Sequence, residues 1–237
     1  MDNEAAAGSA QIASNTADSA PVSDARPCSS ARLVSQGELL CPDGFKWIGL
    51  RKLEYEDEGG VQRSWESVER TTRKGDIDGV EIVPVLVNGP SKRPETVLVS
   101  QFRPPVGDYV LEFPAGLVDA GESAEEAAVR ELKEECGLVG RPFMVSPIVL
   151  EAPGMSNANM RSVYMRVDMS LPENINPVSE NDDSECITTH RVFLDELESA
   201  LLDTKKAFGR PMAVDARIFA LAAGLNFQRT LDLANES

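Results

Sequence analysis

An α/β fold is predicted for this chain, and three stretches of the sequence indicate it. Residues 80–87 (VEIVPVLV) and 95–102 (ETVLVSQF) are rich in β-branched residues and flank a turn-prone Asn-Gly-Pro-Ser, which predicts two strands. Ser123 followed by Glu126 is a capping-box pattern ahead of an alanine-rich stretch, which predicts a helix. A second, apolar helix is expected around residues 214–225. The 237 residues can bury one good core, with a small accessory unit.

The N-terminal part is predicted to contain a tail and a small β unit. Residues 1–35 are small, polar and partly acidic, without the apolar centre of a signal peptide or the basic bias of a transit peptide, so we expect a disordered tail. Residues 45–56 and 61–74 have the composition of two strands around the turn-prone Asp-Glu-Gly-Gly. We therefore predict an N-terminal β-hairpin subdomain over residues 36–74.

Residues 75–230 are predicted to form the main domain, with a C-terminal tail at 231–237. Further strands are expected at 109–116, 144–152, 161–169 and 187–194, and a helix from about Asp195. Residues 171–185 are acidic and irregular. Loops of that length inside a compact domain are usually functional or disordered.

Composition narrows the classes of function. The formal net charge is −16 and the sequence pI is about 4.5, so nucleic acids and anionic membranes are not expected partners. No apolar run is long enough to span a bilayer. The four cysteines lack metal-ligand spacing and are expected to be reduced thiols of a cytoplasmic protein, with access to the nucleus left open. Because His190 is the only histidine, carboxylates are expected to carry the chemistry.

The run from Gly116 to Leu138 is the most informative part of the sequence. Its helix should begin near Ala124 and end at Gly137, where a left-handed residue commonly closes a helix. We expect four residues to form the apolar stripe that buries this helix: Ala128, Val129, Leu132 and Cys136.

Three glutamates of this helix project from another side, and they need a compensating cation. Glu131 and Glu135 stand one turn apart with Glu134 beside them. Arg130 can hold Glu134, four residues away, while Glu122 can fold back toward the same point. The result would be an all-oxygen pocket suited to Mg²⁺. The alternative is a solvated acidic helix face.

The spacing of this run favours the metal site, because it matches the Nudix box, G-x5-E-x7-R-E-U-x-E-E-x-G-U, at every specified position. The chain therefore resembles the Nudix hydrolases, which cleave a nucleoside diphosphate linked to another moiety. The resemblance implies an α/β/α sandwich with a mixed β-sheet. It assigns the metal to the Ala115 carbonyl, Glu131 and Glu135, with Glu134 or Glu122 as secondary ligands. Two or more Mg²⁺ ions are implied, with Mn²⁺ as a possible substitute.

Flanking segments resemble one branch of that family, the ADP-ribose and ADP-sugar pyrophosphatases. The segments that carry this likeness include SWESVERTTRK, VSQFRPPVGDYVLEFPAGLVDAGE, the PGMSN loop and VDARIFALA. This likeness implies hydrolysis of ADP-ribose, or a related ADP-sugar, to AMP and a sugar phosphate. The alternatives are another nucleoside diphosphate sugar or an oxidised nucleotide as substrate, and a non-catalytic module that binds ADP-ribose.

Two tryptophans lie on the two arms of the predicted hairpin. Trp47 and Trp65 could clamp a flat base, or both could be core residues. The resemblance implies that they stack on adenine. It also implies a homodimer with exchanged N-terminal hairpins, in which Glu66 joins them to complete the partner's pocket.

The resemblance also assigns residues to the rest of the substrate. Arg70 and Arg103 match arginines that meet substrate phosphates or the terminal ribose, and a planar guanidinium can grip two phosphate oxygens. The alternative for each is a surface salt bridge. Leu117 matches a residue whose main chain lies along the substrate. Ala152 departs from the branch, where relatives can carry an aspartate.

A general base is still required to take or steer the proton of the attacking water. The resemblance places it on the loop before the last strand of the domain. Glu185, in DDSECITT, aligns best with it, and Glu180 is the second candidate. The alternative is that Glu185 belongs to a solvated acidic loop. Arg130 and Glu134 complete the predicted catalytic group.

Overall fold

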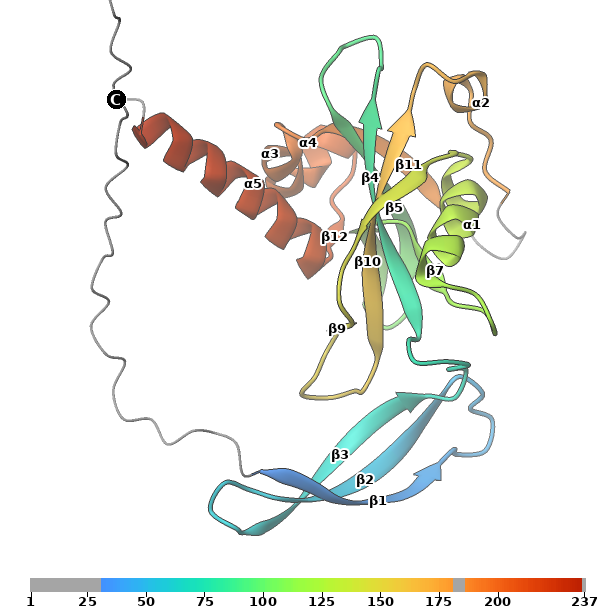
Figure 1. The fold of residues 1–237 in the computed structure, drawn as a ribbon, viewed down its shortest axis with the longest axis vertical. Coiled ribbons are helices and arrows are strands. Elements are labelled where there is room, and N and C mark those ends of the chain that lie inside the picture. The colour runs from blue at the N-terminus through green and yellow to red at the C-terminus, as the bar shows by residue number, and fades with distance from the viewer. Residues whose placement is uncertain (1–30, 181–185, 236–237) are drawn as a thin grey trace, which may run out of the picture. The chain divides into compact units, whose positions relative to one another are not determined.

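The computed structural model describes residues 31–180 and 186–235 (Figure 1). The described chain forms two compact units. The smaller contains the residues up to Gln36 together with Leu53–Trp65, and the larger contains Gly37–Lys52 together with the chain from Glu66 onward. Glu185, the predicted base, lies outside the described residues.

The N-terminal region forms a three-stranded sheet, one strand more than the predicted hairpin. Strands β1 (Arg32–Leu40), β2 (Ile48–Glu56) and β3 (Gln62–Arg70) lie in the order β1-β2-β3. The predicted hairpin is β2 and β3. Its turn is held by the Asp57 carboxylate, which accepts hydrogen bonds from the backbone N–H groups of Gly59 and Val61 at 2.9 and 3.0 Å. Strand β1 begins inside the segment predicted as tail.

The larger unit is built on a mixed sheet, as predicted. The path β12-β6-β5-β4-β10-β8 joins six strands, with β11 on β5, β7 on β4 and β9 on β10. β10 runs parallel to β4, and β12 runs parallel to β6, whereas the other pairings are antiparallel. These strands are β4 (Gly79–Val87), β5 (Glu95–Arg103), β6 (Asp108–Glu112), β7 (Ala115–Leu117), β8 (Arg141–Val145), β9 (Val149–Leu150), β10 (Asn159–Asp168), β11 (Thr188–Phe193) and β12 (Ala213–Val214).

Helices cover both faces of this sheet, so the α/β/α arrangement is confirmed (Figure 1). Successive residues of a strand point to opposite faces, and β4 shows it: Ile82 packs in the cluster that contains α1, whereas Val83 packs in the cluster that contains α3 and α5. The helices are α1 (Ala124–Cys136), α2 (Pro172–Ile175), α3 (Leu197–Leu202), α4 (Thr204–Phe208) and α5 (Ala216–Asn235). None of the described helices combines the length and apolar character needed to cross a membrane.

Helix α1 begins and ends where its local signals predicted. The Ser123 side chain and Glu126 form a reciprocal capping box, and Gly137 closes the helix in the left-handed region at φ 68°. The predicted apolar stripe is wrong at Val129, which is 39 % exposed. The buried positions of the helix are Ala124, Ala127, Ala128, Leu132, Glu135 and Cys136.

Two segments of the second half differ from expectation. The single strand expected at 144–152 is divided into β8 and β9, and Pro147 lies between them. The irregular segment 171–185 contains the short helix α2, which carries proline at its N-terminal end.

Candidate active site

Arg130 organises the loop and helix of the box. Its Nε and Nη2 donate to the two carboxylate oxygens of Glu122, both at 2.9 Å. Nη1 donates to Glu131 at 2.6 Å and to Glu134 at 3.1 Å, while Nη2 also donates to the Leu117 carbonyl at 2.9 Å. A guanidinium has five N–H groups, and these five bonds use all of them. Arg130 is therefore saturated by its own chain.

The charges of this cluster are mutually stabilised. The hydrogen bonds to Glu122 raise the pKa of Arg130 further above its ordinary value, against the opposing effect of burial. The same hydrogen bonds from Arg130 lower the pKa of Glu122, which also accepts the backbone N–H of Asp119 at 3.0 Å. The cation that the like-charged glutamates required is thus present on the same helix.

Two carboxylates of α1 converge on β7. One oxygen of the buried Glu135 accepts the backbone N–H of Ala115 at 3.1 Å. The carboxylate of Glu131 lies against Gly116, where a Cβ would come within 1.9 Å of its Cδ atom. A side chain at position 116 would displace that carboxylate from the place where it accepts the Arg130 N–H at 2.6 Å. Glycine at the start of the box is consistent with this arrangement.

The converging carboxylates fit a hard divalent ion that takes its remaining ligands from water and from substrate phosphate. Of the ligands expected from the sequence, the carboxylates of Glu131 and Glu135 are the two that lie beside Ala115 and Gly116. No group of three or more His, Cys, Asp or Glu side chains is arranged around one metal position within the described residues. Glu122, with both oxygens on Arg130, is less suited to a ligand role than Glu131 and Glu135.

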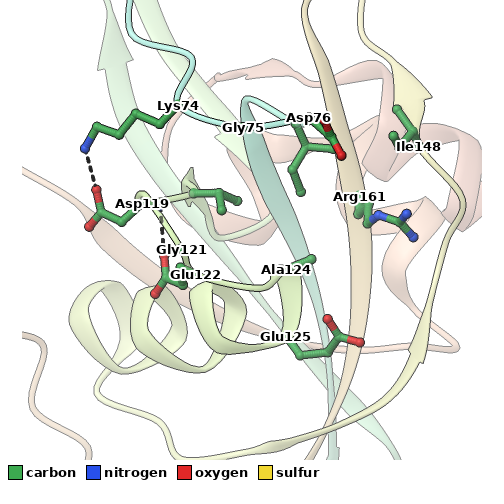
Figure 2. Close-up of a pocket in the computed structure, with 12 residues that line it drawn as sticks. Lys74, Gly75, Asp76, Asp119, Gly121, Glu122, Ala124, Glu125, Ile148 and Arg161 are labelled. Atoms are coloured by element: carbon green, nitrogen blue, oxygen red, sulfur yellow. Dashed lines mark hydrogen bonds and ion pairs between the residues drawn. The ribbon is translucent and has the colours of Figure 1, made fainter.

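A pocket of about 440 Å³ opens beside the loop that joins β7 to α1 (Figure 2). On one wall Lys74 pairs with Asp119 at 2.8 Å, next to Glu122. Arg161 and Glu125 contribute to its lining from β10 and the first turn of α1. The pocket combines charges of both signs with a volume typical of small-molecule sites.

A second pocket of about 510 Å³ lies against β4, β10 and α5, on the sheet face opposite α1. Its buried Glu81 accepts the Ser162 hydroxyl at 3.0 Å and pairs with Arg217 at 3.2 Å. Burial raises the pKa of Glu81 despite these partners. Arg217 also pairs with Asp215 at 2.8 Å, so this network ties α5 to the sheet.

Arg103 stands at the end of β5 and forms the salt bridge that was the alternative to substrate binding. Its Nε and Nη2 donate to the two oxygens of Glu112 at 2.7 and 3.2 Å. The pair uses two of five N–H groups, and the other three make no hydrogen bond within residues 31–180 and 186–235, so Arg103, unlike Arg130, retains donors.

The predicted adenine clamp is exposed. Trp47 and Trp65 are 69 % and 50 % exposed, so the alternative that both are core residues is wrong. The Trp47 backbone is fixed by its carbonyl, which accepts the Thr71 N–H at 3.1 Å. Trp65 packs edge-on against Tyr55 with ring centroids 6.4 Å apart. The two tryptophans belong to different compact units.

The other predicted substrate residues are accessible as well. Glu66 and Arg70 are exposed on β3, and Leu117 is 44 % exposed while its carbonyl is held by Arg130. The PGMS loop lies beside β3, because the Val68 N–H donates to the Met155 carbonyl at 2.9 Å. This bond attaches the loop to β3 two residues before Arg70.

Glu180, the second candidate for the base, is bonded to the end of α1. Its backbone N–H donates to the Glu134 carbonyl at 2.7 Å, and its carboxylate pairs with Lys133 at 3.1 Å. These contacts attach the segment that follows α2 to the C-terminal end of α1. They give no support to Glu180 as the base.

Sequence reasoning missed two ion pairs around the site. Glu112 was not singled out, although its place in EFPAG, just ahead of Ala115, is a signal that could have found it. The buried Asp78 pairs with Arg73 and accepts the Asn159 N–H at 3.0 Å. Burial opposes ionisation of Asp78, but the Arg73 hydrogen bond and charge prevail and lower its pKa.

The α/β/α fold and the intact box define a Nudix-domain protein, and the profile of the NUDIX domain matches residues 80–213. The chain belongs to the Nudix family and is a Nudix hydrolase. It is 43 % identical over 196 residues to the ADP-ribose pyrophosphatase of Saccharomyces cerevisiae, covering 82 % of this chain and 84 % of that one. It is 37 % identical over 196 residues to the ADP-sugar pyrophosphatase of Mus musculus, covering 81 % and 87 %.

A solved structure supports the fold. The crystal structure of an ADP compounds hydrolase superposes with a TM-score of 0.58 and covers 86 % of this chain and 98 % of that one. At 22 % identity this likeness concerns the fold alone.

Proposed function

We propose that this protein hydrolyses the diphosphate of ADP-ribose, or a related ADP-sugar, to AMP and ribose 5-phosphate or the corresponding sugar phosphate. The observation that carries the proposal is the convergence of Glu131 and Glu135 on Ala115 and Gly116. The names of the relatives in yeast and mouse support the substrate class.

The box residues would hold the metal and orient one another. Glu131, Glu135 and the Ala115 carbonyl would bind Mg²⁺, with Mn²⁺ as a substitute and two or more ions in the working complex. Such ions neutralise charge on a diphosphate and lower the pKa of bound water. Arg130 fixes Glu131 and Glu134 beside the Leu117 carbonyl. We retain Glu185 as the proposed base from its position in the sequence.

The substrate would be held at its other end by exposed groups. Trp47 and Trp65 would stack on adenine, with Glu66 and Arg70 beside them. We also propose a homodimer that exchanges its N-terminal strands, so that these residues complete the partner's pocket. A cytoplasmic location is part of the same proposal, supported by the free thiols of Cys41, Cys136 and Cys186.

The test is turnover by the purified protein with Mg²⁺ and a substrate panel. ADP-ribose, ADP-glucose, GDP-mannose, NADH and oxidised nucleotides would be compared, with chelated metal as the control. We expect ADP-ribose or an ADP-sugar to have the highest kcat/KM, with AMP as a product and no turnover after chelation. Preference for GDP-mannose or an oxidised nucleotide would contradict the proposed substrate, and no turnover at all would contradict the proposed reaction.

A further inference from the structure

We infer that Glu112 is a positioning residue, which orients Arg103 so that its remaining N–H groups meet a phosphate of the substrate. The inference rests on the proposed function. The proposed site has a problem of charge, because its substrate is an anion and the box brings together four carboxylates: Glu122, Glu131, Glu134 and Glu135.

Arg130 does not solve this problem. All of its N–H groups are used by acceptors of its own chain, so none is left for a phosphate oxygen. Arg103 has the capacity that Arg130 lacks. Its side chain is 42 % exposed, and both N–H groups of Nη1 and one of Nη2 remain after the bonds to Glu112.

Glu112 fixes the direction of those free groups. Its side chain is only 12 % exposed, and the two parallel bonds hold the guanidinium by one edge. Charge-assisted bidentate pairs of this kind give geometric specificity as well as energy. Held by its Nε edge, Arg103 presents the Nη1 edge to an incoming anion.

Glu112 also connects Arg103 to the proposed metal end of the site. It is the last residue of β6, three residues before Ala115. The intervening segment is attached to β4, because the Pro114 carbonyl accepts the Ile82 N–H at 2.8 Å and β7 pairs with Gly79–Glu81. Glu135 then bonds Ala115. Arg103 and Glu135 are thereby bonded to the two ends of one short stretch of chain, from Glu112 to Ala115.

The chain contains a matched control for this pair. Arg191 donates from Nε and Nη2 to both oxygens of Glu95, each at 3.0 Å. The side chains of Arg191 and Glu95 are 44 % and 11 % exposed, close to the 42 % and 12 % of Arg103 and Glu112. Glu95 begins β5 and Arg103 ends it, so the two pairs belong to the same strand but to opposite ends.

The experiment compares Glu112→Gln with Glu95→Gln, using Mg²⁺ and ADP-ribose. We expect Glu112→Gln to lower kcat/KM about tenfold or more, chiefly through KM, and Glu95→Gln to change it less than about twofold. Adding Arg103→Ala to Glu112→Gln should reduce kcat/KM no further than Arg103→Ala alone, since both act through one group. Thermal unfolding of each variant measures the purely structural cost.

Arg103→Lys provides a second test if Glu112→Gln does not fold. It keeps the charge but cannot make the bidentate contact, so a similar loss is expected. Wild-type kcat/KM in Arg103→Lys, equal losses in Glu112→Gln and Glu95→Gln, or additive losses with Arg103→Ala would each overturn the inference while the proposed function stands. A wild-type protein without turnover would remove the proposed function and the inference together.

Discussion

Glu135 is a carboxylate held at 5 % exposure on a helix that otherwise buries small and apolar side chains. Burying a charge is costly unless it is paired, hydrogen-bonded or bound to metal. One of its oxygens accepts the Ala115 N–H, which brings the carboxylate to the residue whose carbonyl we propose as a metal ligand.

We predict that Glu135→Gln lowers kcat by orders of magnitude while the protein stays folded. The amide is nearly the same size but is a poor ligand for a hard cation. Steady-state turnover of ADP-ribose with saturating Mg²⁺ measures the loss, and circular dichroism measures the fold.

Glu81→Gln is the control at equal burial. Glu81 is also 5 % exposed, but it pairs with Arg217 on the opposite sheet face. We expect it to change stability and to leave most of kcat intact. Similar kcat losses in both variants would show that burial of a carboxylate, and not the metal position, explains the effect.

Single residues also show where sequence reasoning stops. Trp47 and Trp65 were predicted on the two arms of one hairpin, and Trp47 lies one residue ahead of β2. Tryptophan is both apolar and a good stacking group, so the sequence left core and clamp open. Exposure rules out the core alternative, and the clamp stays a proposal. Arg103 was predicted to grip phosphate with two N–H groups. The position of Glu112 ahead of Ala115 could have marked it as a site residue, but its bond to Arg103 depends on how β5 pairs with β6.

At the scale of elements, the boundaries that were predicted best are those set by residues close to them in the sequence. The ends of α1 depend on Ser123, Glu126 and Gly137, all within a turn of the boundary, and both ends are confirmed. Val129 was misassigned because the side of a helix that is buried depends on the sheet below it. β1 was missed because its exposed residues show no apolar alternation that would separate them from a tail.

The end of α1 also makes a close contact with the segment after α2. A Cβ on Gly137 would lie 2.5 Å from backbone atoms of Val178, and Gly137 has φ 68°. Gly209 closes α4 at φ 82°, yet a Cβ there would meet nothing within 4 Å. The two glycines therefore separate the cost of conformation from the cost of a clash.

We predict that Gly209→Ala costs about 1–2 kcal/mol in the free energy of unfolding, from left-handed strain alone. Gly137→Ala should cost about 1–3 kcal/mol more, because backbone atoms of Val178 must also move. Chemical denaturation of both variants gives the comparison. Equal costs would mean that the 176–180 segment yields freely and does not pack firmly on α1.

At the scale of the whole molecule, the proposed exchange of N-terminal strands makes each site depend on two chains. Trp65→Ala would then damage the pocket that its own hairpin completes, in the partner, whereas Glu135→Gln would damage the site of its own chain. Each homodimer of these variants would be inactive or weakly active.

We predict that mixed dimers of Trp65→Ala and Glu135→Gln regain activity. Each mixed dimer has one intact site of two, so purified mixed dimers should show about half of wild-type activity. Co-expression with two different affinity tags isolates the mixed species. Activity no higher than the mean of the two homodimers would contradict the exchange and would place Trp65 in the site of its own chain.

The five acceptors around Arg130 have a consequence for what can stand at that position. Lysine carries the same charge, but its ammonium has three donors, so at least two of the five acceptors would lose their partner. A substitution scale based on charge would rate lysine as equivalent. No other side chain has five N–H donors, so no replacement at position 130 would keep all five hydrogen bonds.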